Sequence, residues 1–306
     1  MTRVLVTGAT GYVGSQLVRQ LIGKGGYEVS VLVRPTSNLA LLNAYMADLR
    51  IHQSDGTVES LTKVLQEARP AVVVHLASLF LSQHAPQDVL PLIQANIQFG
   101  TCLLEAMLQA GIRRFVNTGT AWETMDGPPV YRPVCLYAAT KRAFEDILTY
   151  YEDAHGFSAL TVKLYDTYGP EDPRPKLFSL LMRSLEAQEP IPFSPGEQTL
   201  DLTYIDDVTA AFERAICYLL TKNTPRPEEV HVGSGQGRPL REVVRIFEEA
   251  VGQRANIGWG ERPYRAREVM RAQADLAAAE HLLGWMPTIE LAEGIRRTFV
   301  PESRDR

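Results

Sequence analysis

The chain has 306 residues, 45% of them hydrophobic and 22% charged, which suits one large α/β unit or two closely packed domains. Its formal net charge of −5 and its lack of a long basic run argue against nucleic acid or a membrane surface as a partner. No apolar run approaches the roughly 18 residues of a membrane span, and the strand pattern that follows Met1 leaves no room for a signal peptide.

The cysteines and histidines form no site pattern. Cys102, Cys135 and Cys217 are odd in number and widely spaced, which fits neither a disulfide framework nor a metal site. Free thiols suit a reducing compartment, so we expect a cytoplasmic protein. The six histidines show no ligand spacing such as His-x-x-x-His, and we predict no metal.

The first strand leads into a glycine-rich turn. Residues 3–7 are a β-branched run typical of a buried parallel strand, followed by Gly8-x-x-Gly11-x-x-Gly14 and a helical pattern through Ile22. Glycines at this spacing let the backbone approach a pyrophosphate, and the helix N-terminus supplies amide donors. We therefore predict a dinucleotide-binding site.

The end of the second strand indicates which dinucleotide. Residues 27–33 form this strand, and Arg34 follows it with Ser37 nearby. An acidic residue about 20 positions past the glycines would hold the adenosine ribose of NAD. An arginine instead pairs with a 2′-phosphate, which a carboxylate would repel. We favour NADP over NAD; the alternative is that Arg34 is a solvated loop residue.

Alternation of strands and helices continues to about residue 118. The predicted elements are a strand at 49–52, a helix at 57–68, a strand at 71–76, a long helical stretch to 110 and a strand at 113–118. Repeated βα units with apolar strands predict a Rossmann-type doubly wound parallel sheet.

Polar positions after these strands are candidates for cofactor contacts. Asp55 and Gly56 follow the third strand and are placed to meet adenine, while Ala77 and Ser78 follow the fourth and would lie along the cofactor. Asn96 lies within the long helical stretch. It is equally consistent with a cofactor contact and with a buried packing residue.

The fifth strand ends in Thr118-Gly119-Thr120-Ala121-Trp122. Ligands of open α/β sheets bind beyond the carboxyl ends of the strands, so a hydroxyl here can hydrogen-bond a substrate carbonyl or alcohol. Two threonines leave the assignment open, with Thr118 as the first choice and Thr120 as the second.

A tyrosine and a lysine follow at helical spacing. Tyr137 and Lys141 share one face of the helix predicted for residues 137–154, one turn apart. A phenol keeps its proton to a pH of about 10, and a neighbouring ammonium lowers that pKa. Tyr137 can then give or take a proton near neutrality, unless the pair lies on an ordinary surface helix.

In this order, the glycine motif, the strand-end hydroxyl and Tyr137-x-x-x-Lys141 resemble the extended short-chain dehydrogenase/reductase family, in particular its nucleotide-sugar epimerase, dehydratase and reductase branch. The resemblance spans nearly the whole chain and includes residues 74–77, Asn96-x-x-x-Gly100-Thr101 and residues 164–170. It implies a Rossmann domain with a smaller C-terminal α/β substrate-binding domain. We expect residues 1–168 to form the first and residues 169–306 mainly the second, with crossings between them.

The resemblance also implies roles for individual residues. Thr118 and Tyr137 would hold the reacting oxygen, while Lys141 would orient the nicotinamide ribose and lower the pKa of Tyr137. Expected cofactor-binding residues are Gly8, Thr10, Gly11, Tyr12, Val13, Gly14, Arg34, Ser37, Asp55, Gly56, Leu76, Ala77, Ser78, Asn96, Thr118, Tyr137, Lys141, Tyr165 and Thr167. Expected substrate-binding residues are Thr120, Trp122, Asp166, Lys176, Arg265 and Glu268.

Some of these assignments have competing readings. Arg265-x-x-Glu268 resembles an arginine and acid that hold a nucleotide, whereas the alternative is an ion pair on a helix surface, and Arg262 competes for the first role. Asp206 and Asp207 precede a helix and are as consistent with capping as with ligand binding. Many relatives carry an arginine at the place of Leu200, so one polar contact that the resemblance would imply has no matching residue here.

The residues after the catalytic hydroxyl narrow the choice among reactions of this family. Dehydratases of this family carry an Asp-Glu pair there, and with Thr118 as that hydroxyl the two places hold Gly119 and Thr120. A dehydratase is therefore not expected. Because Arg34 favours a dissociable NADP, which suits net reduction, we expect an NADPH-dependent reductase of a nucleotide-activated 4-keto-6-deoxy sugar. The alternative is an NAD-dependent nucleotide-sugar 4-epimerase, followed by a nonenzymatic NADP-sensing protein. The resemblance further implies a homodimer that pairs the helices at 86–110 and 137–154.

Overall fold

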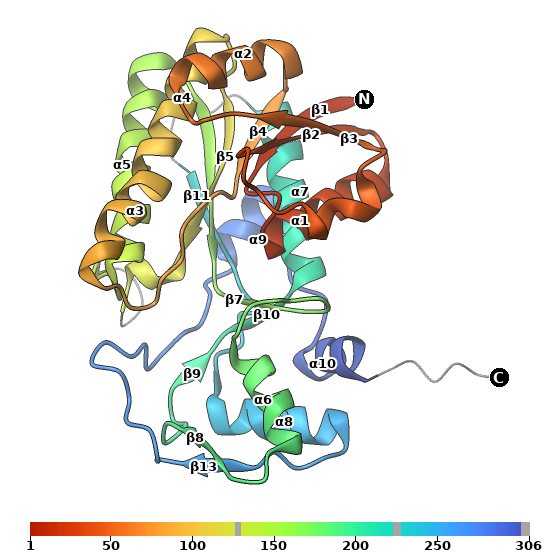
Figure 1. The fold of residues 1–306 in the computed structure, drawn as a ribbon, viewed down its shortest axis with the longest axis vertical. Helices are drawn as coiled ribbons and strands as arrows, with labels where there is room; N and C mark the ends of the chain where they lie inside the picture. The colour runs from red at the N-terminus through yellow and green to blue at the C-terminus, as the bar shows by residue number, and fades with distance from the viewer. Residues whose placement is uncertain (126–129, 223–227, 301–306) are drawn as a thin grey trace, which may run out of the picture.

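The structure is a computed structural model that describes residues 1–125, 130–222 and 228–300 (Figure 1). Within these ranges, no helix is both long enough and apolar enough to cross a membrane.

A seven-stranded parallel sheet forms the centre of the larger lobe (Figure 1). Its order is β11-β6-β5-β4-β1-β2-β3, and every neighbouring pair is parallel. The strands are β1 (Thr2–Thr7), β2 (Tyr27–Val33), β3 (Leu49–Gln53), β4 (Val72–His75), β5 (Arg114–Thr120), β6 (Ser158–Leu164) and β11 (Glu228–Val232). The order reverses between β1 and β4, which places a ligand-binding crevice at the carboxyl ends of these two strands.

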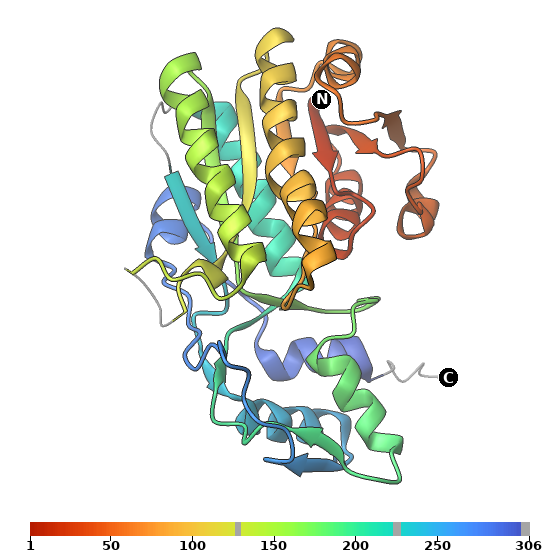
Figure 2. The same cartoon turned by 60° about the vertical axis from the view of Figure 1, so that its left-hand side comes forward.

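Helices cover both faces of the sheet, as the two views show (Figures 1 and 2). One face carries α2 (Val58–Ala68), α4 (Phe99–Gln109) and α5 (Leu136–His155), and the other carries α1 (Tyr12–Lys24), α7 (Ile205–Thr221) and α9 (Ala277–Leu283). Alternate residues of β1 serve the two faces: Val4 and Val6 join one core and Leu5 the other. The predicted doubly wound parallel sheet is confirmed.

The helical stretch before β5 is interrupted. It consists of η2 (Pro86–Asp88), α3 (Val89–Ile93), a π-helical turn η3 (Gln94–Gln98) and α4. Asn96 lies in the π-helical turn, and its side chain bonds the backbone of Leu79 and the hydroxyl of Thr140. An inserted residue of this kind turns a side chain out of the regular helical register.

The smaller lobe is built from short strand pairs and helices (Figure 1). Parallel pairs join β7 to β10 and β8 to β13, and β9 pairs with β12 in the antiparallel sense. The elements of the smaller lobe are β7 (Asp166–Tyr168), α6 (Leu177–Glu186), β8 (Ile191–Phe193), β9 (Thr199–Leu200), β10 (Leu202–Tyr204), β12 (Arg238–Pro239), α8 (Leu240–Val251), β13 (Ile257–Trp259) and α10 (Leu291–Phe299). Two short helices, η1 (Ala40–Tyr45) and η4 (Ala121–Glu123), contact α1 and α5 of the larger lobe.

After residue 169 the chain contributes three elements to the larger lobe. Helix α7 packs on α1, β11 adds to the sheet beside β6, and α9 packs on α7 and β11. We therefore propose that residues 205–221, 228–232 and 277–283 belong structurally to the nucleotide-binding domain, although they follow the expected boundary.

Two buried aspartates tie these returns to the loops around them. The carboxylate of Asp201, which is fully buried, accepts hydrogen bonds from the backbone of Ser234, Gly235 and Ala274. The carboxylate of Asp207 accepts hydrogen bonds from the backbone N–H groups of Thr288 and Ile289, at 3.0 Å each. Asp207 therefore holds a distant loop, which is neither the helix capping nor the ligand binding that the sequence left open.

Asp201→Ala is expected to lower the free energy of unfolding by about 3 kcal/mol, because three N–H groups lose their acceptor in a buried place. Urea denaturation measures the loss. Asp275→Ala is the matched control: its carboxylate is exposed, accepts one bond from Ala277, and should cost about 1 kcal/mol or less. Equal losses for the two variants would contradict the role given to Asp201.

Candidate active site

Close backbone contacts explain the glycines between β1 and α1. Gly8 has a φ of +72°, and a Cβ there would lie 2.5 Å from the amide nitrogen of Ala77. A Cβ on Gly14 would lie 2.2 Å from the carbonyl oxygen of Gly8, whereas one on Gly11 would meet nothing closer than 3.4 Å. The loop is thus pressed onto the segment after β4 on one side and open at Gly11, where the first N–H groups of α1 can bind an anion.

The residues after β4 are fixed against this loop. Thr7 at the end of β1 accepts a bond from the amide of Ala77 and pairs with the Nδ1 atom of His75 at 2.9 Å. The amide of Leu76 bonds the carbonyl of Thr7. Leu76 and Ala77, expected to line the cofactor, therefore lie directly beside the glycine loop.

At the end of β2, Arg34 is exposed, and its backbone amide bonds the hydroxyl of Ser37 at 3.0 Å. No ion pair of its guanidinium occurs among the described residues. Asp55 has a structural use, because it accepts two bonds from Thr57, and these lower the pKa of Asp55. Gly56 beside it has a φ of +87°. A cationic group is therefore available at the place where an adenosine ribose or its phosphate would lie.

Tyr137 and Lys141 are both buried at the start of α5, with 9% and 1% of their surface exposed. Burial raises the pKa of Tyr137, although hydrogen bonding with Thr120 and Ser78 acts in the opposite direction. Burial outweighs these opposing hydrogen bonds, so the pKa of Tyr137 is raised overall, and a lowering of this pKa by Lys141 stays a prediction. Burial also lowers the pKa of Lys141 to about 8.

The two threonines of β5 have different surroundings. Thr120 acts on the phenol of Tyr137 and also accepts a bond from the amide of Trp122 at 3.3 Å. The hydroxyl of Thr118 is buried, and within the described ranges it has no hydrogen-bond partner. Thr120 and Ser78 are thus the hydroxyls that act on the pKa of Tyr137, and the choice of Thr120 over Thr118 for the catalytic role stays a prediction.

Asn96 is only 1% exposed. Its oxygen accepts from the amide of Leu79 at 2.8 Å, and its nitrogen donates to the carbonyl of Leu79 and to Thr140. These bonds hold the segment after β4 against α5. The structure therefore favours the packing reading of Asn96 over direct contact with a cofactor.

A cavity of about 440 Å³ opens between the two lobes. It brings together residues expected to bind substrate, together with the competing arginine and an aromatic residue that sequence reasoning missed. These are Trp122, Asp166, Lys176, Arg265, Glu268, Arg262 and Phe80. Lys176 pairs with Asp166 at 3.4 Å, so the lining of the cavity carries both charges.

Phe80 connects this cavity to the catalytic pair. Its ring lies edge-on to Tyr137 with centroids 5.0 Å apart, and it is 5.4 Å from the ring of Trp122. The ammonium of Lys176 lies 5.9 Å from the same ring. Its position just past the carboxyl end of β4 was the sequence signal that could have identified Phe80.

The reading of Arg265 and Glu268 as a helix-surface ion pair is wrong, because both lie in the loop between β13 and α9. Their contact is a turn in which the carboxylate of Glu268 accepts from the backbone amide of Arg265 at 3.2 Å. Both residues line the cavity.

The segment from β6 to β7 closes the other side of the site. The hydroxyl of Tyr165 donates to the carbonyl of Gln273 and lies 3.1 Å from His231. Thr167 is buried and lines the cavity, and its carbonyl accepts from Arg174, whose guanidinium covers the ring of Tyr12 at 4.6 Å. Arg174 thus connects Tyr12 with Thr167.

Comparisons with known proteins agree with this geometry. The model of the NAD dependent epimerase/dehydratase family matches residues 4–233. A UDP-glucose 4-epimerase of Mycolicibacterium smegmatis is 31% identical over 97% of each chain, and a CDP-abequose synthase of Yersinia pseudotuberculosis is 28% identical over 88% of this chain and 90% of that one.

Solved structures show the same fold. The UDP-glucose 4-epimerase of Thermus thermophilus in complex with NAD is 26% identical, with a TM-score of 0.81 and 97% of each chain covered. MoeE5 in complex with UDP-glucuronic acid and NAD is also 26% identical over 97% of each chain, with a TM-score of 0.80. The chain therefore belongs to the NAD-dependent epimerase/dehydratase family of extended short-chain dehydrogenases/reductases.

Proposed function

We propose that the protein is an NADPH-dependent reductase of a nucleotide-activated 4-keto-6-deoxy sugar. The observation that carries the cofactor choice is Arg34, an exposed guanidinium at the end of β2 that no described carboxylate pairs. It suits a 2′-phosphate, and it stands where a carboxylate would hold the ribose of NAD. The similarity to CDP-abequose synthase supports a reductase.

The residues present fit a dinucleotide. The crowding at Gly8 and Gly14 and the open face at Gly11 leave a cradle for a pyrophosphate at the start of α1. Leu76, Ala77 and the end of β5 would lie along the nicotinamide half. When bound, the nicotinamide supplies the hydride for the keto carbon.

Side chains of the protein then stabilise the negative charge that develops on the keto oxygen of the substrate. Thr120 donates a hydrogen bond to the carbonyl, and Tyr137 gives its proton as the alkoxide develops. Because burial raises the pKa of Tyr137, the proton stays on the phenol until a stronger base appears. Lys141 orients the ribose, and its positive charge favours the phenolate left behind.

The cavity offers matching groups for the rest of the substrate. The guanidinium of Arg265 suits a diphosphate and the carboxylate of Glu268 suits a ribose diol, with Arg262 beside them. The rings of Phe80 and Trp122 form an apolar wall next to Tyr137. An apolar wall is better matched to a deoxygenated sugar carbon than to a hydroxymethyl or carboxylate group.

A nucleotide-sugar 4-epimerase is the second candidate. The 31% identity to a UDP-glucose 4-epimerase over nearly the whole chain favours it. The same Thr120, Tyr137 and Lys141 would serve, with NAD retained through oxidation and re-reduction of the sugar. A homodimer through α4 and α5 is part of either proposal.

The cofactor choice is tested by fluorescence titration with NADPH and NADH. We expect exchangeable binding that prefers NADPH, and Arg34→Ala should weaken NADPH by about tenfold while leaving NADH unchanged, because it removes one charge-assisted contact. Arg50→Ala is the control, since Arg50 pairs with Glu28 on the neighbouring strand. NAD retained through purification would instead favour the epimerase.

Tyr137→Phe is expected to lower kcat by about 10³-fold, because the proton donor is lost while the ring and its packing remain. Cofactor affinity should stay near that of the wild type. Tyr151→Phe is the matched control on the same helix, where the hydroxyl bonds Glu105 far from the site. Steady-state kinetics with a panel of 4-keto-6-deoxy nucleotide sugars measures both, and an active Tyr137→Phe enzyme would rule out the mechanism.

The choice between the threonines is tested by two equivalent substitutions. Thr120→Val should reduce kcat by about 10²-fold, because the carbonyl loses a hydrogen-bond donor. Thr118→Val should leave kcat within about threefold of the wild type and keep the fold, since it removes an unpartnered hydroxyl from the same strand. The opposite order of effects would return the role to Thr118.

A further inference from the structure

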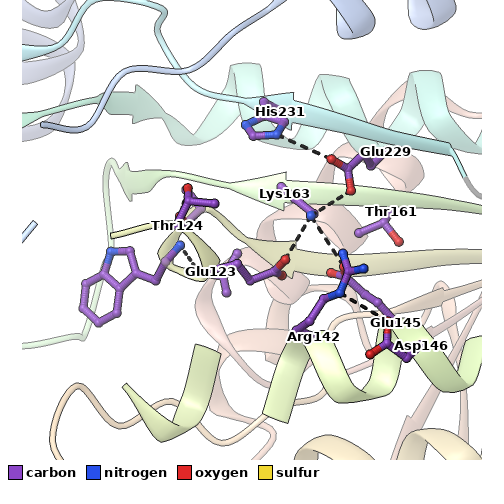
Figure 3. Close-up of polar contacts among 12 residues, drawn as sticks. Glu123, Thr124, Arg142, Glu145, Asp146, Thr161, Lys163, Glu229 and His231 are labelled. Carbon is purple, nitrogen blue, oxygen red and sulfur yellow. Dashed lines mark hydrogen bonds and ion pairs between the residues drawn. The ribbon is translucent and has the colours of Figure 1, made fainter. Parts of the chain in front are cut away.

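Between helix α5 and the sheet, Lys163 of β6 lies among three carboxylates (Figure 3). Its ammonium is 2.9 Å from Glu123, 3.5 Å from Glu145 and 2.7 Å from Glu229. The side chains of Lys163, Glu123 and Glu145 are each at least nine-tenths buried, whereas that of Glu229 is half exposed. Burying several charges in one place costs free energy unless they are paired, so the fold holds these four side chains together as one paired cluster.

Gly119 makes room for this cluster. A Cβ at that position would lie 2.7 Å from the Oε1 atom of Glu145 and 2.9 Å from the Cγ atom of Lys163. Gly119 separates the two threonines of β5, so the carboxylate of Glu145 lies against the backbone that carries Thr120. A glycine within a strand often marks such a close approach.

The carboxylates of Glu123 and Glu145 compete for one cation. Their Oε1 atoms are buried, and in the described part of the chain neither has a hydrogen-bond partner. Burial, and then the charge of Glu123, raises the pKa of Glu145, while Lys163 opposes this. Arg142, one turn earlier on α5, reaches Glu145 only at 3.7 Å and is partly exposed. Glu145 therefore holds its proton more tightly than an ordinary carboxyl does.

This cluster acts on the catalytic lysine. Glu145 follows Lys141 by one helical turn, and although burial lowers the pKa of Lys141, Glu145 and then Glu123 raise it. His75 faces Lys141 from β4 but is uncharged at neutral pH, because burial and then Lys141 lower the pKa of His75 to about 3. Once ionised, Glu145 is thus the main counter-charge of the Lys141 ammonium.

We propose that Glu145, held in place by Lys163 and Glu123, is a positioning residue that keeps Lys141 protonated during turnover. As the pH rises, Glu145 becomes ionised and stabilises the ammonium, which burial alone would discharge. Lys141 then remains a cation beside Tyr137 over a wider alkaline range. The inference rests on the proposed function, because it assumes that Lys141 supports Tyr137.

Glu145→Gln tests this by keeping the shape of the side chain and removing its charge. The alkaline limb of the kcat/KM profile should move to lower pH by about one unit, so that activity at a pH of about 8 falls several-fold. Glu145→Asp keeps the charge and should restore the limb. Glu229→Gln is the matched control: Glu229 also contacts Lys163, but it does not act on Lys141, and its limb should stay in place.

A second readout does not depend on turnover. The chain has six lysines, so protein labelled with [¹³C]lysine gives a small set of Cε resonances, and the one lost in Lys141→Met belongs to Lys141. Its midpoint should fall by about one pH unit in Glu145→Gln and stay unchanged in Glu229→Gln. An unchanged midpoint in Glu145→Gln would overturn the proposal.

The two proposals fail in different ways. If Tyr137→Phe stays active, the catalytic assignment fails whatever the lysine titration shows. If Tyr137→Phe is inactive but Glu145→Gln shifts neither the limb nor the midpoint, only the role of Glu145 fails. Should Glu145→Gln not fold, as judged by circular dichroism, Glu123→Gln replaces it and should shift both in the same direction by a smaller amount; no shift there would overturn the proposal.

Discussion

The structure depends on one close backbone approach, that of the loop after β1 to the segment after β4. The sheet order reverses between these strands, so the helices that follow them pack on opposite faces of the sheet and leave a crevice. At Gly8 no Cβ fits between the loop and Ala77, which brings α1 close to the end of β4. The same crevice lies next to β5 and α5, and so the dinucleotide cradle and the catalytic pair share one sheet edge.

The sequence predicted what short spacing determines. The glycine turn depends on neighbouring residues, and the pairing of Tyr137 with Lys141 depends only on one helical turn. Apolar strands alternating with helices were enough for the order and type of the elements in the first half. The long helical stretch was predicted without its π-helical turn, because that turn reflects the contact of Asn96 with Leu79, which is distant in sequence.

What the sequence could not decide required contacts between elements. Thr118 and Thr120 are two residues apart in a strand, so both point to the same side, and only the position of Tyr137 separates them. Arg265 and Glu268 have helical spacing but lie in a loop held by turns. The pKa of Tyr137 depends on how completely α5 is covered, which no local pattern reveals.

The return of the chain at β11 has a consequence for biosynthesis. Strand β6 is followed by more than sixty residues before β11 pairs with it, since β6 ends at Leu164 and β11 begins at Glu228. A nascent chain that has emerged only through β6 exposes an apolar strand edge, which is a template for pairing with other chains. The part of the smaller lobe that lies between β6 and β11 must therefore emerge from the ribosome before the sheet of the larger lobe can be completed, and truncations ahead of β11 leave that edge open.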